Sequence, residues 1–174
     1  YSMKNADDNY CERNVYYSLL ECISTKLEND DICMEDIFSL LQAMFSSPWA
    51  LCRVIADLDI DDFDLCSLAT LWKNQAEDEL NQIDYLLNEN PDAISGRLLY
   101  AMDFVEQEIV ITDDNNGKIV VFSEFPETLW KFGEILEQRG ISCVCFTSNM
   151  LREELEDSVY DFQNNEECRV ILCD

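Results

Sequence analysis

Three short apolar runs rich in β-branched residues constrain the fold of this chain most strongly. They span residues 118–123 (KIVVFS), 141–146 (ISCVCF) and 169–173 (RVILC). Continuous apolar runs of this length are typical of strands that are covered on both faces, as in parallel sheets. Helical patterns separate them. The order β-α-β-α-β therefore predicts an α/β fold with a three-stranded parallel sheet and right-handed crossovers.

Apolar stripes at helical spacing mark the helices of this half of the chain. Ser95 is a candidate N-cap for the helix that precedes the first strand, and Gly140 is a candidate C-terminal residue for the helix that follows it. The stripes are Leu98, Leu99, Met102, Val105 and Ile109, then Leu129, Phe132 and Leu136, and finally Leu151, Leu155, Val159 and Phe162. Each stripe requires a partner surface to cover it.

The first ninety or so residues are helical in pattern. Ser47 is a candidate N-cap and Pro48 a candidate first helical residue, since proline loses no hydrogen bond there. The stripes are Val15, Leu19, Cys22 and Ile23, then Ile37, Leu40, Leu41 and Met44, then Leu51, Val54, Ile55 and Leu58, and last Leu68, Leu71, Trp72, Leu80, Ile83, Leu86 and Leu87. The Asn90-Pro91-Asp92 segment ends the last helix. We therefore predict a helical region at 1–92 and an α/β region at 93–174.

The charge balance excludes several functions. The chain has 11 Lys and Arg, 37 Asp and Glu and no His, which gives a net charge of −26. A chain this acidic is a poor autonomous DNA binder, because affinity for nucleic acid comes largely from Lys and Arg that displace counterions. The lack of histidine excludes Ser-His-Asp and Cys-His catalysis and any imidazole-ligated metal.

The nine cysteines favour buried thiols over disulfides or zinc ligands. Their number is odd, most stand within apolar runs, and no Cys-x-x-Cys pair occurs. Cys143 and Cys145 should share one face of a strand. We expect an intracellular, reducing location, because no basic-then-apolar leader and no apolar run of about 18 residues is present. A membrane is therefore not among the expected partners.

Phosphate- and metal-binding motifs are incomplete. Gly117-Lys118 lacks the P-loop glycine, since Thr112 holds that position, and lacks the P-loop hydroxyl, since Ile119 holds that one. The acidic segment 57–64 alternates like a calcium loop but lacks the central glycine and has Leu68 at the closing position. We therefore interpret it as a solvated loop. Trp49, Trp72 and Trp130 stand at helical apolar spacing, which predicts core positions.

The α/β half resembles a known family. Its matching features are Ser95-Gly96-Arg97-Leu98-Leu99, the KIVVFSEF run at 118–125, Leu129, Leu136, Gly140-Ile141, and Phe162 ahead of the CRVIL run at 168–172. Together they resemble the start of the C-terminal RecA-like lobe of superfamily-two helicases, above all the Swi/Snf-type DNA-dependent ATPases, including the RapA/HepA-like group. The segment 46–51 is similar to the helical stretch that leads into that lobe. The resemblance implies a helical interlobe region followed by an incomplete RecA-like sheet.

The resemblance also implies site residues. Ser123 falls in the first motif of the second lobe, which approaches the nucleic-acid backbone, and Glu124 stands where Gln or His is common. Counting back from Phe162, Leu155 stands where the family has Arg and Ser148 where it has Gly, so a weaker grip on the DNA strand is expected. We assign Ser123 and Ser148 as nucleic-acid-binding residues by this resemblance. We assign no catalytic, cofactor-binding or metal-binding residue.

The implied function is that of one part of a motor. In the family, the N-terminal lobe holds the P-loop and the magnesium motif, and further motifs of the second lobe would follow Asp174. ATP and magnesium are thus expected for a parent protein, not for this chain alone, which should not hydrolyse ATP. The expected partners are that N-terminal lobe and DNA, in the nucleus if the source is eukaryotic. We also expect the third strand to present a free sheet edge that favours aggregation.

Two alternatives remain at this stage. A degenerate lobe could serve as an acidic scaffold for basic proteins such as histones, which the charge of −26, Ser148 and Leu155 favour. An acidic α/β domain with no connection to nucleotides is the third interpretation. DNA-stimulated ATP turnover by the complete protein separates the motor from the scaffold, and an upstream sequence without a P-loop would favour the third.

Overall fold

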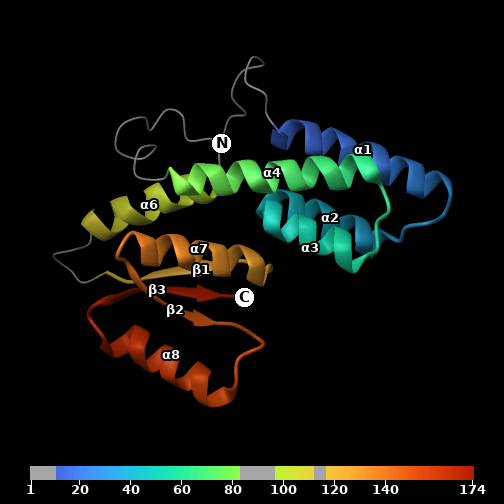
Figure 1. The fold of residues 1–174 in the computed structure, drawn as a ribbon. Helices are drawn as coiled ribbons and strands as arrows, with labels where there is room; N and C mark the ends of the chain where they lie inside the picture. The colour runs from blue at the N-terminus through green and yellow to red at the C-terminus, as the bar shows by residue number, and fades with distance from the viewer. Residues whose placement is uncertain (1–10, 83–96, 112–116) are drawn as a thin grey trace. The chain divides into compact units, whose positions relative to one another are not determined.

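The computed structural model describes residues 11–82, 97–111 and 117–174, which form two compact units, Tyr1–Asp78 and Glu79–Asp174 (Figure 1). The predicted boundary between residues 92 and 93 lies outside the described residues, as do Ser95, the Asn90-Pro91-Asp92 segment and the end of the last predicted stripe.

The described residues of the first unit form α1 (Cys11–Glu28), α2 (Met34–Ser46), α3 (Pro48–Asp57) and most of α4 (Phe63–Asn81), which continues past Asp78. The predicted stripe of α1 is confirmed, since its four residues are at most 6% exposed. A turn in which Asp30 has φ of 56° ends α1 and redirects the chain. Aspartate tolerates this left-handed conformation better than most residues do. Cys33 therefore lies outside α1, as the N-cap of α2, whereas Cys22 lies within α1.

The predicted start of α3, with Ser47 as N-cap and Pro48 as the first helical residue, is confirmed. Ser47 Oγ accepts a hydrogen bond of 3.1 Å from the Ala50 N–H, and Pro48 occupies the first turn of α3. Ser47 is buried at 2% exposure, so its hydroxyl satisfies a donor that water does not reach. The Trp49 indole N–H, 3.2 Å from Glu77 Oε1, links the start of α3 to α4.

The acidic loop before α4 has a structural role. Asp62 Oδ1 accepts a hydrogen bond of 2.8 Å from the Leu65 N–H, as an N-cap does. The stripe predicted for α4 is wrong at Leu71, which is 57% exposed. The buried line passes through Leu65, Ala69 and Trp72 instead, because a spacing of 3.6 residues per turn places Leu71 beside that line.

The second unit contains the predicted parallel sheet. Its strands are β1 (Ile119–Phe122), β2 (Ser142–Phe146) and β3 (Cys168–Cys173), in the order β1-β3-β2. Both pairings are parallel, and Phe122, Cys173 and Phe146 are in register. The predicted fold is thus confirmed. The expected free edge of the third strand is wrong, because β3 lies between the other two strands.

In the part of this unit that the structure describes, the helices α6 (Arg97–Ile111), α7 (Pro126–Gln138) and α8 (Arg152–Asn164) accompany the sheet. The helices α7 and α8 lie on opposite faces of the sheet (Figure 1), and α6 packs against α7. A Cβ on Gly133 of α7 would lie 3.3 Å from Leu172 Cδ1, so the helix approaches β3 closely at this residue. Gly140, with φ of 72°, follows α7 as predicted.

The prediction that all three strands are covered on both faces is wrong for β1. Val120 is 49% exposed and Phe122 is 74% exposed, whereas their neighbours Ile119 and Val121 are half-buried. Alternate residues of a strand point to opposite faces, and Val120 pairs with Ile171 on the face that α8 covers. Since α8 packs mainly on β2 and β3, that face of the edge strand stays open.

The core positions predicted for the tryptophans, Leu151 and the cysteines are confirmed for some residues and wrong for others. Trp72 is buried and Trp49 is half-buried, but Trp130 is 49% exposed, so its core assignment is wrong. Leu151 is the N-cap of α8 and is 71% exposed, because it stands before the first turn and not on its stripe. Cys33 is exposed, unlike the buried thiols Cys22, Cys168 and Cys173. None of the helices in the described ranges is both long and apolar enough to cross a bilayer.

Candidate nucleic-acid interface

The carboxyl ends of the three strands lie together at one end of the sheet. This end, which is distinct from the outer strands, is called here the carboxyl edge. Ser123 follows β1, Thr147 and Ser148 follow β2, and Asp174 follows β3. Parallel strands end on the same side, and ligands of open α/β sheets bind at such ends. The structure therefore places the two serines assigned from sequence on one edge, on the two outer strands, with the end of β3 between them.

Ser123 is fixed by the backbone on both of its sides. Its N–H donates a hydrogen bond of 3.1 Å to the Cys173 carbonyl, which extends the β1 and β3 pairing by one residue. Its Oγ accepts a bond of 3.1 Å from the Phe125 N–H. Pro126 then begins α7, where its missing N–H costs nothing. The hydroxyl thus holds the turn that leads from β1 into α7.

Ser148 is bound on both of its donors by one carboxylate. Its N–H lies 2.8 Å from Asp174 Oδ1 and 2.9 Å from Asp174 Oδ2. Its hydroxyl donates to Asp174 Oδ2 at 2.8 Å. The backbone of Asp174 is itself held by β2, since its N–H lies 3.3 Å from the Phe146 carbonyl. The sequence reasoning did not identify Asp174 as a site residue, although it is the first polar residue after a buried strand.

The loop from Thr147 to Leu151 is a closed turn. The Met150 N–H donates to the Thr147 carbonyl at 3.0 Å, and the Thr147 hydroxyl donates to Asn149 Oδ1 at 2.6 Å. The Leu151 N–H, 2.7 Å from Glu154 Oε2, caps α8. With 2% exposure, Thr147 anchors the turn in the sheet. In this loop, the backbone N–H groups of Ser148 and Leu151 therefore both donate to carboxylates.

The opposite end of the sheet, called here the amino edge, is held by cations. Lys118 Nζ donates to the carbonyls of Asn165 and Cys168 at 2.6 and 2.7 Å. It also lies 5.5 Å from the centre of the Phe162 ring, which is a cation–π distance. Arg169 Nε donates to the Gly117 carbonyl at 2.7 Å. Sequence reasoning assigned no role to these two cations.

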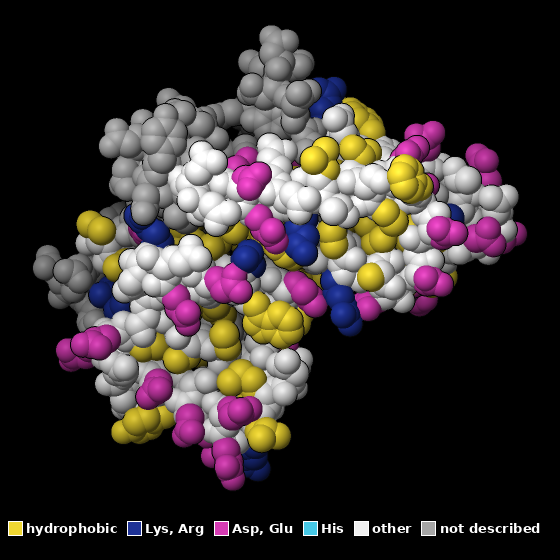
Figure 2. Space-filling model, viewed as in Figure 1, with side chains coloured by type: hydrophobic (Ala, Val, Ile, Leu, Met, Phe, Trp, Pro, Cys, Tyr) yellow, Lys and Arg dark blue, Asp and Glu magenta, His cyan; other side chains and the backbone are white. Residues whose placement is uncertain are grey.

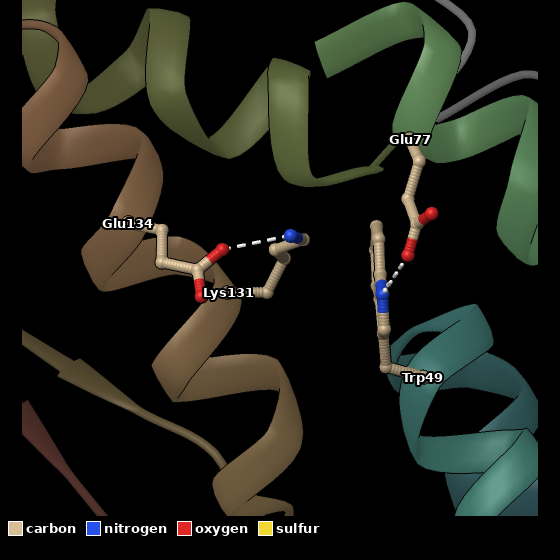
Figure 3. Close-up of polar contacts among 4 residues, drawn as sticks. All are labelled: Trp49, Glu77, Lys131 and Glu134. Atoms are coloured by element: carbon tan, nitrogen blue, oxygen red, sulfur yellow. Dashed lines mark hydrogen bonds and ion pairs between the residues drawn. The ribbon is translucent and has the colours of Figure 1, made fainter. Parts of the chain in front are cut away.

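Other described cations of this unit are paired with acids. Arg139 Nε lies 2.6 Å from Glu106 Oε1, a contact in which both side chains are less than 30% exposed. Lys131 Nζ lies 2.7 Å from Glu134 Oε2 (Figure 3). Arg152, at the start of α8, pairs with Glu156 at 2.8 Å while 90% of its side chain stays exposed. Figure 2 shows acidic side chains gathered over α8. Arg152 is thus the described cation nearest in sequence to the Ser148 turn with an accessible guanidinium.

The remaining residues singled out by the resemblance have simpler positions. Leu155 is half-buried on α8, where the family has Arg, and Glu124 is exposed after Ser123. Phe162 packs near Lys118 at the amino edge. At the position where the resemblance expects Arg, this chain therefore has a half-buried leucine.

The sheet thiols are held neutral by burial. Desolvation raises the pKa of Cys143 from 9.0 to about 12, and the nearby thiol of Cys145 and carboxylate of Glu137 act in the same direction. Burial likewise raises the pKa of Cys173, with the Asp174 carboxylate next in importance. Within residues 11–82, 97–111 and 117–174, no cluster of Cys, Asp and Glu is arranged to hold a metal ion. These thiols are therefore packing groups at neutral pH, not thiolate ligands or nucleophiles.

Comparisons with known proteins agree with this geometry. Residues 100–173 match the family described as helicase conserved C-terminal domain. A comparison with curated proteins gave no match. Among solved structures, the chain is similar to the C-terminal part of the Fun30 ATPase domain, with a TM-score of 0.51 and 9% identity over 95% of this chain and 65% of that chain. The SWI2/SNF2 ATPase C-terminal domain of Sulfolobus solfataricus has a TM-score of 0.40 and 17% identity over 75% of this chain and 56% of that chain.

The chain spans 65% of the Fun30 structure's length, and at 9% identity that likeness concerns the fold. The family match lies within the sheet unit and includes all three strands, α7 and α8. Residues 100–173 therefore match the helicase conserved C-terminal domain, and the chain has a fold similar to that of the C-terminal part of the Fun30 ATPase domain, consistent with the partial Swi/Snf-type lobe that the sequence predicted.

Proposed function

We propose that this chain contributes the C-terminal lobe of a Swi/Snf-type, DNA-dependent ATPase and that the carboxyl edge of its sheet contacts a DNA strand. The observation that carries the proposal is the placement of Ser123 and Ser148 at one edge of a parallel RecA-like sheet. Serine hydroxyls and backbone N–H groups are common ligands of phosphate oxygens in protein–DNA complexes.

The partner in this proposal is an N-terminal motor lobe, which would supply the ATP and magnesium site. The present lobe contributes closure and strand contact, and Arg152 supplies the accessible cation beside the Ser148 turn. We further propose an intracellular, reducing location, nuclear in a eukaryote, which the free thiols of the eight described cysteines support. Membership of the RapA/HepA-like group is part of the same proposal.

DNA-stimulated ATP turnover by the complete protein tests the proposal. Each of the variants Ser123→Ala and Ser148→Ala should raise the DNA concentration for half-maximal stimulation by about fivefold, the effect of losing about 1 kcal/mol of hydrogen bonding. Ser142→Ala is the matched control, because Ser142 is exposed at the amino edge, and it should leave that concentration unchanged.

Two results would contradict the proposal. The first is a complete protein that neither binds DNA nor turns over ATP, which would leave the acidic scaffold as the better interpretation. The second is a normal response to DNA in both serine variants, which would move the DNA contact away from the carboxyl edge.

A further inference from the structure

The N–H and hydroxyl of Ser148 resemble an anion-binding site in which the bound anion is the carboxylate of Asp174, a residue of the same chain. An N–H and an O–H from one residue converge on a single carboxylate, at distances of 2.8 to 2.9 Å. Charge-assisted bonds of this length are among the stronger hydrogen bonds in proteins. The same pair of donors, a serine hydroxyl and its backbone N–H, would suit a phosphate oxygen equally well.

The fold determines the position of Asp174. Asp174 stands one residue beyond the central strand, and the bond from its N–H to the Phe146 carbonyl holds it beside the Ser148 turn. A hydrogen bond from the Met150 N–H to the Thr147 carbonyl closes the Ser148 turn. Both sides of the contact therefore lie just beyond the end of a strand, and neither depends on a long flexible side chain.

We infer that Asp174 is a specificity-determining residue that occupies the phosphate position at Ser148 and so weakens binding of a nucleic-acid backbone. This inference rests on the function proposed above. A phosphodiester at Ser148 must displace the carboxylate or lie beside it, and like charges a few ångströms apart repel by about 1 kcal/mol even in water. The cations of the sheet unit whose side chains the structure describes already contact other groups, and Arg152, the most exposed of them, pairs with Glu156.

Neutralising Asp174 in the full-length chain tests the inference, with a fluorescent single-stranded DNA oligonucleotide as the probe. Asp174→Asn keeps the size of the side chain and removes its charge, and fluorescence anisotropy should show affinity about fivefold higher than wild type. Glu166→Gln is the matched control, because it removes one charge from an exposed residue just before the other end of β3. That control should change affinity by less than about twofold, as expected for a charge more than a Debye length away.

Two additions make the result specific to Ser148. In a Ser148→Ala background, Asp174→Asn should gain only about threefold, because the hydroxyl that would receive the phosphate is missing. Asp174→Ser serves as a second neutral variant, with circular dichroism to verify the fold. Competition by millimolar inorganic phosphate should weaken binding by Asp174→Asn more than by wild type, because a free anion that approaches the Ser148 donors then meets no carboxylate.

The outcomes separate this inference from the function on which it rests. A gain confined to the Asp174 variants supports the inference. Equal gains in Asp174→Asn and Glu166→Gln overturn it in favour of general charge repulsion, and the proposed function stands. Unchanged DNA affinity in both Asp174 variants also overturns it alone. A complete lack of DNA binding by wild type and every variant overturns both.

Discussion

The two ends of the same sheet are held by groups of opposite charge. At the amino edge, the cations Lys118 and Arg169 donate to backbone carbonyls. At the carboxyl edge, the carboxylate of Asp174 accepts from Ser148, and that of Glu154 accepts from the Leu151 N–H. The comparison shows that Lys118 and Arg169 act where strands begin, at the end of the sheet away from the edge where a nucleic acid is expected.

This difference also assigns different tasks to the two edges. The cations of the amino edge join segments about fifty residues apart and so contribute to stability. The carboxyl edge carries a short contact between exposed groups, whose loss should cost the fold little but should change what the edge binds. Four predictions follow from this division, beginning with the core that both edges share.

Leu172→Ala should destabilise the sheet unit by about 3 kcal/mol, because Leu172 is fully buried in the central strand and its loss leaves a cavity beneath α7. Urea unfolding followed by circular dichroism measures the change. Val120→Ala, at an exposed position of β1, is the control and should cost less than about 1 kcal/mol. Similar losses for both variants would show that β3 is not the core of the unit.

Lys118→Met should cost about 2 kcal/mol, because it leaves the carbonyls of Asn165 and Cys168 without their charged donor while it keeps the apolar stem. The same unfolding measurement applies. Arg152→Met is the control, since its ion pair is exposed and should contribute less than about 0.5 kcal/mol. If both variants unfold at the same urea concentration, the amino edge is not a stabilising element.

The stability of the sheet unit should fall as the pH rises from about 9 toward 12. An unfolded Cys143 thiol ionises near its ordinary pKa of 9.0, whereas the folded thiol stays neutral until about 12. A raised folded pKa therefore contributes stability that is complete below pH 9 and is lost above it. Thermal unfolding between pH 8 and 11 should show a shallower decline for Cys143→Ala than for wild type. Cys33→Ala, which removes a thiol of the first unit, should leave the decline of the sheet unit as steep as in wild type.

Asp174→Asn should change the free energy of unfolding by less than about 1 kcal/mol, the smallest effect of the four, because the contact is exposed and the amide oxygen can still accept a hydrogen bond. Urea unfolding beside Lys118→Met measures the contrast directly. A loss as large as that of Lys118→Met would mean that both edges stabilise the fold equally, and the proposed division of tasks would be wrong.

Sequence reasoning succeeded where structure depends on neighbouring residues. The Ser47 cap and Pro48 start of α3 depend on four consecutive residues, and Gly140 marks the end of α7 for an equally local reason. The strands were recognised from their β-branched runs. Ser123 and Ser148 were assigned by family resemblance alone, and the parallel pairing of the strands is what brings them to one end of the sheet. Their binding role stays a prediction.

Sequence reasoning failed where structure depends on distant partners. The central position of β3 and the open face of β1 depend on strand order, which no local pattern encodes. The bond between Ser148 and Asp174 joins residues 26 positions apart, and the bonds of Lys118 join residues 47 and 50 positions apart. Polar residues at strand ends could have been flagged as a group, but their pairing could not.

The strand order has a consequence for how the lobe is made. Because β1 and β2 both pair with β3 and not with each other, neither has its hydrogen-bonding neighbour until the later strand has left the ribosome. Nascent chains of this lobe should therefore pass through a stage in which two apolar segments are synthesised but unpaired, a stage at which chaperones can bind. Ribosome-stalled chains that end before residue 168 should be more sensitive to protease than chains in which β3 has emerged.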